Sequence, residues 1–237
     1  MDRAGIMWEW LRRDPAYINW YKIASLAPRA SASPSIWGLQ FAEAPDTFAQ
    51  QARIIWDAAL DPATLAIAVR PAQTAGPDLV DLDDLTPWLT IANGDNGWQH
   101  AVLSDGRNRI RLDVIEGSLA TRGRALIEYR IAGTISAEAR IMPLRRFLYL
   151  ARHRRFSRSL FPADPKTRRW IVLLRVHDAL GAGASQREIA NILFGDVRVT
   201  RDWHGTSDSL RSRVRRLAYD ARALAQGGYR HLMRRNC

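Results

Sequence analysis

The spacing of the apolar residues changes twice along the chain, and this change constrains the fold more than any other feature. In the first quarter they recur every three or four positions, as they do in helices. From about residue 64 they fall in short runs separated by Gly, Asp and Asn. In one run, NRIRLDV, Ile110, Leu112 and Val114 alternate with polar residues, which indicates a half-buried antiparallel strand. From SAEARIM onward the helical spacing returns. The chain is therefore predicted to be α+β, with N-terminal helices, a small antiparallel β-sheet of three to five strands and an all-α C-terminal domain.

Helices are predicted on both sides of an early loop, PRASASPSI. Ahead of it, MWEWLRRDPAYINWYKI divides into two helices, because Asp14 is a good N-cap and Pro15 is tolerated in a first turn. After it, a further helix is predicted from Asp46 to Leu60. The side chains expected to face inward from this helix are Phe48, Ala52, Ile55 and Trp56.

The positive charge lies almost entirely in the last third of the chain. Residues 151–237 contain 19 Lys and Arg against 7 Asp and Glu, whereas residues 1–150 contain 16 against 17. Such asymmetry predicts a domain that binds a polyanion. The alternative is a basic, solvated surface in an arginine-rich protein. The segment FPADPKTRR suggests the boundary: residues 1–160 as a mixed helix and sheet domain with an oligomerisation or regulatory role, and residues 161–237 as the basic domain.

The basic domain shows the beginning of a helix-turn-helix. TRRWIVLLRVHDALG is predicted to be a helix that the following glycines end. In SQREIANILFG, Ser185 is placed to cap a short helix, with Glu188 completing a capping box and Gly195 ending the helix. A capped helix after a longer one across a tight turn is how this motif starts. The buried face of the short helix is predicted to contain Ile189, Ile192 and Leu193.

A third helix is predicted to start near Ser207 or Asp208, after a loop of about ten residues, DVRVTRDWHG, whose Trp203 packs back on the helices. Its apolar stripe contains Leu210, Val214, Leu217, Ala221 and Leu224. Its opposite face and flanks hold polar and basic side chains that can contact phosphates or bases in a major groove. Together with the first turn of the preceding helix, the predicted DNA-binding residues are Gln186, Arg187, Ser209, Arg211, Ser212, Arg213, Arg215, Arg216 and Tyr219.

These features also resemble a known family. GASQREIANILFGD, the isolated Trp203, SLRSRVRRL and GGYRHLM together resemble the C-terminal domain of RovC-type activators and of regulators of integrative conjugative elements, over roughly residues 166–235. WEWLRRDPAYINWY is similar to a short region often found ahead of that domain. The resemblance implies a helix-turn-helix variant, DNA binding and oligomerisation. Because some regulators of this kind are antiactivators, it leaves the direction of regulation open.

Motifs that would indicate catalysis or a cofactor are not found. The five histidines show no ligand spacing with Cys, Asp or Glu, and no phosphate-binding glycine loop is present. The single cysteine excludes an internal disulfide, and no uncharged run approaches the roughly 20 residues of a membrane span. We therefore expect a protein that is not an enzyme, has no cofactor or metal, lies in the cytoplasm and does not contact a membrane.

The function predicted from these observations is sequence-specific DNA binding by a transcription regulator, most simply an activator. The expected partners are double-stranded DNA, further copies of the chain, and RNA polymerase or another regulator. The alternative is a protein-interaction module of the antiactivator kind, which uses the same fold without binding DNA. The arginines of the third helix favour DNA, because a protein-binding face would be more apolar.

Overall fold

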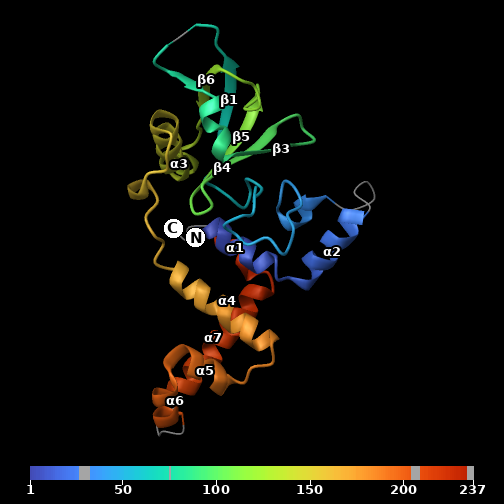
Figure 1. The fold of residues 1–237 in the computed structure, drawn as a ribbon, viewed down its shortest axis with the longest axis vertical. Helices are drawn as coiled ribbons and strands as arrows, with labels where there is room; N and C mark the ends of the chain where they lie inside the picture. The colour runs from blue at the N-terminus through green and yellow to red at the C-terminus, as the bar shows by residue number, and fades with distance from the viewer. Residues whose placement is uncertain (27–32, 75, 204–208, 234–237) are drawn as a thin grey trace.

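The chain has the predicted α+β architecture, with a curled sheet at one end and a group of helices at the other (Figure 1). The N-terminal helices lie between these two parts. The computed structural model describes residues 1–26, 33–74, 76–203 and 209–233.

The first helix, α1 (Arg3–Leu11), is buried on every side. The Asp2 carboxylate accepts a hydrogen bond from the Gly5 N–H at 2.8 Å and so caps the helix. Every residue from Ala4 to Leu11 is buried, including Glu9. A helix buried all round belongs in the interior of a protein, and α1 contacts both the sheet side and the C-terminal helices. The second helix, α2 (Pro15–Leu26), begins at the predicted proline.

The helix predicted over residues 46–60 is wrong. This segment forms turns, and an isolated bridge joins Leu39 to Trp56. Ile54, Ile55 and Trp56 are buried in succession, although none of them lies in a helix. Ala52 is also buried, as predicted, but Phe48 is 56% exposed. Within the segment read as a loop, residues 34–37 form the short 3-10 helix η1 (Pro34–Trp37).

The sheet contains six strands in the part of the chain that the structure describes, in the order β2-β6-β1-β5-β4-β3. The strands are β1 (Leu65–Pro71), β2 (Leu79–Asp81), β3 (Leu89–Asn93), β4 (Gln99–Ser104), β5 (Arg109–Glu116) and β6 (Arg124–Arg130). The sheet has one strand more than the three to five predicted, and one of its five pairings departs from the predicted antiparallel arrangement. β1 and β5 pair in parallel, while the other neighbours are antiparallel. A parallel pair needs a crossover, and here the chain between β1 and β5 supplies β2 to β4.

Strand β5 is buried on both faces rather than on one. Ile110, Leu112 and Val114 alternate as predicted and belong to the core beneath α3 (Thr134–His153). Arg111 and Asp113, which were expected to face solvent, are also buried. The Arg111 guanidinium forms an ion pair with the Asp113 carboxylate and donates a hydrogen bond to the Trp56 main-chain oxygen. The two buried charges are therefore paired.

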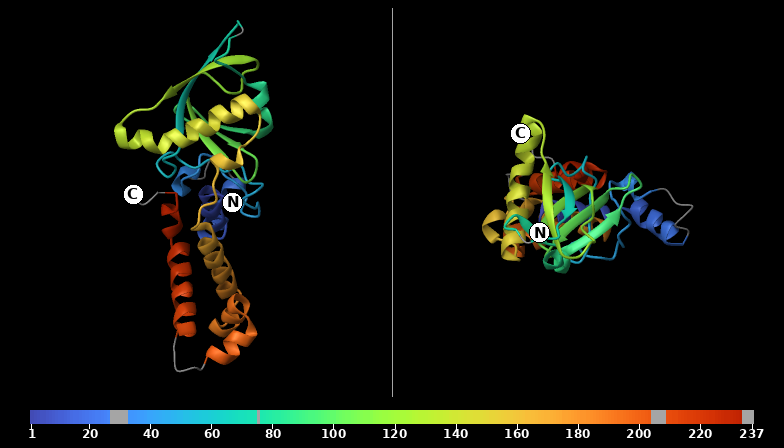
Figure 2. Two further views of the ribbon diagram at one scale, coloured as in Figure 1. Left: turned by 90° about the vertical axis from the view of Figure 1, so that its left-hand side faces the viewer. Right: turned by 90° about the horizontal axis from the view of Figure 1, so that it is seen from above.

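The C-terminal helices form an extended arm. α4 (Thr167–Gly181) and α7 (Ser209–Ala225) lie side by side, and α5 (Gln186–Phe194) and α6 (Asp196–Asp202) lie at the end far from the sheet (Figures 1 and 2). The segment predicted as a loop after Gly195 therefore contains α6, although Trp203 does pack on the helices as predicted. The predicted start of the third helix at Ser207 or Asp208 lies outside the described residues. Three further 3-10 helices complete the described elements: η2 (Asp83–Trp88), η3 (Arg158–Leu160) and η4 (Gly228–His231).

Among the described residues, the buried apolar side chains form two clusters. One contains the inner faces of the sheet and of α3. The other contains α1, the segment up to Trp56, and α4 to η4. The N-terminal helix thus shares its core with the C-terminal arm. Whether residues 1–160 and 161–237 fold as separate domains stays a prediction.

Candidate nucleic-acid interface

The capping box predicted for α5 is present. The Ser185 Oγ accepts a hydrogen bond from the Glu188 N–H at 3.3 Å, and the Glu188 carboxylate accepts one from the Ser185 N–H at 2.7 Å. The hydrogen bond from the Ser185 backbone lowers the pKa of Glu188, because it favours the charged carboxylate. Gly195 ends the helix with a φ of 84°, a conformation that glycine adopts readily. These features fix where α5 begins and ends.

The buried face of α5 differs from the prediction at one position. Ile189 and Ala190 are buried and Leu193 is partly buried, but Ile192 is 76% exposed. At 100° per residue, Ile192 lies about 160° from Ala190, so it falls outside the buried arc. Ile189 and Ile192 are equally apolar, and the sequence does not show where the centre of the buried face lies between them.

The apolar stripe predicted for α7 is confirmed in outline. Leu210, Val214 and Ala221 are buried, whereas Leu217 and Leu224 are partly exposed. This stripe contacts α4 and α5. An ion pair at 2.6 Å between Arg169 of α4 and Asp220 of α7 further joins the two long helices.

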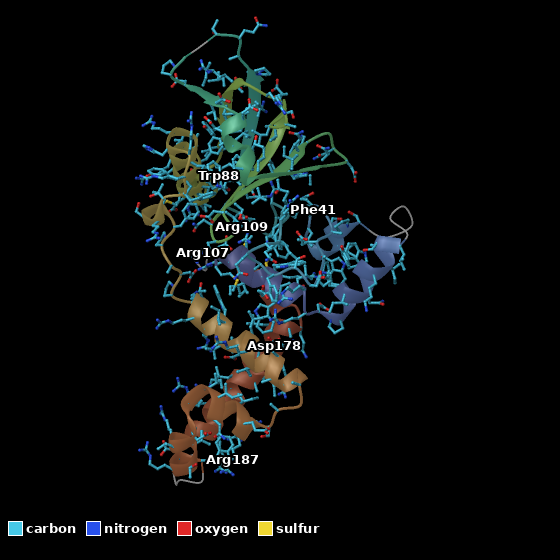
Figure 3. All side chains as sticks on the ribbon, in the orientation of Figure 1. Phe41, Trp88, Arg107, Arg109, Asp178 and Arg187 are labelled. Atoms are coloured by element: carbon cyan, nitrogen blue, oxygen red, sulfur yellow. The ribbon has the colours of Figure 1, made fainter. Side chains whose placement is uncertain are left out.

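The predicted DNA-binding side chains lie on the solvent side of α7 and in the first turn of α5. Those described as exposed are Gln186, Arg187, Arg211, Arg213, Arg215, Arg216 and Tyr219. Ser212 is partly exposed, and the side chain of Ser209 lies outside the description. α7 begins at the end of the arm, where it contacts α5, and Figure 3 places Arg187 at the same end. The fold therefore brings the two predicted groups to one end of the molecule.

Phe194 links the three helices at this end and was missed by the sequence analysis. The Arg213 guanidinium of α7 lies 4.9 Å from the centroid of its ring, and that of Arg198 in α6 lies 5.8 Å from it. A cation held over an aromatic face is stabilised and loses some of its freedom to rotate. An aromatic residue at the last position of α5, within a strongly basic region, is the signal that could have identified it.

The arginines at this end differ in their electrostatic partners. Arg198 and Arg201 of α6 both pair with Asp202, at 3.7 Å and 2.7 Å. The hydrogen bond from Arg201 lowers the pKa of Asp202, so the carboxylate stays charged. By contrast, Arg187 and Arg216 form no ion pair within the ranges that the structure describes. Their charge is the more available to an external anion.

The same described ranges contain neither a metal site nor a membrane span. No group of three His, Cys, Asp or Glu side chains there is arranged to hold a metal ion. No helix described there combines the length and the apolar character needed to cross a bilayer.

Comparison with protein families assigns this arm. Residues 130–234 match the family described as "T6SS, Transcription factor, DNA binding domain", of the RovC type. The chain carries a RovC-type DNA-binding domain. Residues 1–42 match a second family, described as a proteobacterial transcriptional regulator-like domain. The comparison with curated proteins gives no match. The resemblance seen in the sequence is thus confirmed, and the chain is a DNA-binding transcriptional regulator.

The match to the RovC-type domain begins earlier in the chain than the resemblance seen in the sequence. The RovC-type domain begins near residue 130 and so includes α3, whereas the sequence motifs were found only from about residue 166. The two matched regions are also joined directly. Arg3 pairs with Asp164 at 2.6 Å, and Arg13 pairs with Asp178 at 2.7 Å, a residue that Figure 3 labels on α4.

Proposed function

We propose that the chain is a sequence-specific activator of transcription, and that the solvent side of α7 with the first turn of α5 contacts duplex DNA. The observation that carries the proposal is the exposure of a basic helix face opposite a buried apolar stripe, at the free end of the arm. The face is held in place by the core behind it. It therefore needs no rearrangement to meet a ligand.

The dimensions of α7 suit the major groove. A helix with its side chains is about 10–12 Å across, and the major groove is about 12 Å wide. Ser212, Arg216 and Tyr219 follow one another at spacings of four and three residues, which places them along one side of the helix. Arginine can hydrogen-bond a guanine edge through two N–H groups, whereas Arg187 on α5 would contact phosphate. We assign base reading to α7 and backbone positioning to α5.

The arrangement also supports a helix-turn-helix variant. α5 and α6 meet at Gly195 and contact one another, and α7 packs on α5 after them.

As an activator, the protein would bind DNA as a homo-oligomer in the cytoplasm and contact RNA polymerase or another regulator. The exposed apolar side chains of Ile23, Leu26 and Ile36, all before the sheet, support self-association. Sedimentation of the full chain at several concentrations tests self-association, and a monomer at the highest concentration would contradict it.

A second candidate is the interaction module of the antiactivator kind. Ile192 and Val197 favour it, because they are 76% and 85% exposed on α5 and α6 and are apolar. Under this candidate, replacing both residues with serine would abolish binding of the partner regulator, and the protein would show no preference for any duplex.

Fluorescence anisotropy with duplexes from the upstream regions of neighbouring genes, compared with scrambled duplexes, separates these roles. Arg216→Ala and Ser212→Ala should lower the ratio of specific to non-specific affinity, since a good bidentate base contact discriminates by about 1–3 kcal/mol. Arg187→Ala should weaken both kinds of binding equally. Arg222→Ala, an exposed arginine further along α7, is the matched control and should leave the ratio unchanged. An unchanged ratio in folded Arg216→Ala and Ser212→Ala proteins would refute base reading by α7.

A further inference from the structure

We propose that the groove between α3 and the β2–β6 edge of the sheet binds a small organic anion with an apolar body. The groove has a volume of about 720 Å³. Small-molecule sites in proteins commonly have volumes of about 300–1,000 Å³, so it is large enough for a ligand of this kind. The proposal concerns a part of the chain distant from the DNA-contacting end of the arm and does not depend on that assignment (Figure 1).

The walls of the groove are apolar and partly open to solvent. Val80 of β2, Ile127 of β6 and Leu148 of α3 line it. The side chain of Leu148 is 47% exposed. An alkyl or aromatic group placed here would remove this apolar surface from water, which stabilises the complex by about 25 cal/mol per Å² buried.

The charge on the rim selects an anion. Arg145, Arg152 and His153, all on α3, line the groove, and among the described residues lining it Asp78 is the single carboxylate. Arg145 and Arg152 are exposed, lie seven residues apart and so share one side of the helix. Neither forms an ion pair with a carboxylate in the described ranges.

The helix dipole explains only some of the positive side chains along the groove. Arg152 and His153 lie in the last turn of α3, where a cation is favoured by the helix dipole in any protein. Arg145 lies about two turns earlier, where the dipole effect has fallen away. Its position at an apolar groove therefore points to an external partner, and a carboxylate is the group that arginine binds best.

Hydroxyl groups add a second set of contacts. Tyr129 lines the groove from β6, and Ser157 and Ser159 line it from the segment after α3, with their Oγ atoms 2.9 Å apart. Burial raises the pKa of Tyr129 to about 12, so its hydroxyl remains a hydrogen-bond donor at neutral pH. Together with the arginines, these hydroxyl groups would orient a carboxylate within the groove.

An occupant would bridge two parts of the chain. One wall of the groove is the β2–β6 edge and the other is α3, which lies inside the RovC-type domain. From α3 the chain continues through Phe161 to α4, and the Arg146 Nε donates to the Leu160 main-chain oxygen at 2.8 Å. A ligand that fixes α3 against the sheet thus acts at the origin of the DNA-binding arm.

The proposal is tested with octanoate as the probe, by isothermal titration calorimetry on the full chain. Octanoate should bind saturably, and octylamine, which has the same alkyl chain and the opposite charge, should not. Arg145→Gln combined with Arg152→Gln should weaken octanoate binding about tenfold or more, since both charge-assisted hydrogen bonds to the carboxylate are lost. Arg155→Gln is the matched control, because this exposed arginine follows α3 without lining the groove.

A second variant tests the apolar wall. Leu148→Glu places a carboxylate in the groove at an already exposed position and should abolish octanoate binding without unfolding the chain, which circular dichroism checks. Three results would overturn the proposal: no saturable binding of octanoate, equal binding of octanoate and octylamine, or equal weakening by Arg155→Gln and by the double variant.

Discussion

Replacing Trp10 with alanine should destabilise the C-terminal arm, although about 160 residues separate the two in sequence. Trp10 is 2% exposed on α1, and its ring lies 5.3 Å from that of His177 on α4. Burying a tryptophan removes about 150–250 Å² from water, which contributes about 4–6 kcal/mol at 25 cal/mol per Å². The Trp10 Nε1 has no hydrogen-bond partner within the described chain, which costs about 1–3 kcal/mol. The cavity left by the truncation adds to the loss, so we expect a net destabilisation of about 3–5 kcal/mol.

The assay is denaturant unfolding followed by circular dichroism, combined with amide hydrogen exchange resolved by helix. In Trp10→Ala, amides of α4 and α7 should lose protection together with those of α1. Trp10→Phe is the control: it keeps most of the buried surface and removes the unpaired N–H, so it should cost only about 1–2 kcal/mol. Unchanged protection of α4 and α7 in the alanine variant would show that the arm folds without α1, as the predicted boundary near residue 160 requires.

Three further predictions concern binding, acidity and capping. The logarithm of the DNA association constant should fall linearly with the logarithm of salt concentration, by about 0.9 per phosphate neutralised, with roughly five or more contacts per bound dimer; a flat titration would contradict DNA binding by the arm. Burial raises the pKa of Asp61 from 3.8 to about 6, so its ionisation costs stability as pH rises from about 4 to 6. In urea unfolding, Asp61→Asn should match the wild type near pH 4 and exceed it by about 1–3 kcal/mol above pH 6; a constant difference would rule out this cause. Ser185→Ala should lower the free energy of unfolding by about 0.5–2 kcal/mol, and Ser185→Asp should lower it by less. If the alanine variant melts at the same temperature as the wild type, the cap contributes nothing to stability.

Local chemistry made several elements predictable from the sequence. The break at Asp14-Pro15, the capping box at Ser185 and the glycine after α5 each act within a few residues, so one sequence contains all the information they need. The stripe of α7 was also predictable, because its apolar spacing is not interrupted by any residue that disfavours a helix.

The errors arose where distant contacts decide the structure. Residues 46–60 have the spacing of a helix, but distant contacts fix them in turns: the bridge between Leu39 and Trp56 and the hydrogen bond from the Ala49 N–H to Glu9. The parallel pairing of β1 with β5 depends on a crossover that no local pattern reports. For the site, the predicted arginines share one end of the arm, but the position of Arg213 over Phe194 requires the packing of three helices. Which of these side chains contact DNA stays a prediction.

The burial of α1 has a consequence for synthesis of the chain. α1 leaves the ribosome well before the arm, yet Arg3 donates a hydrogen bond to the main-chain oxygen of Leu232, 229 residues later. At about 5–20 residues per second, those residues take roughly 10–50 seconds to be made. For most of that interval Trp10 lacks part of its cover, because its ring packs beside His177 of α4. We therefore expect this surface to be covered temporarily during synthesis, by a chaperone or by the sheet, whose strands all precede the arm in the chain. The core that α1 shares with the arm is complete only when the last helices have been made.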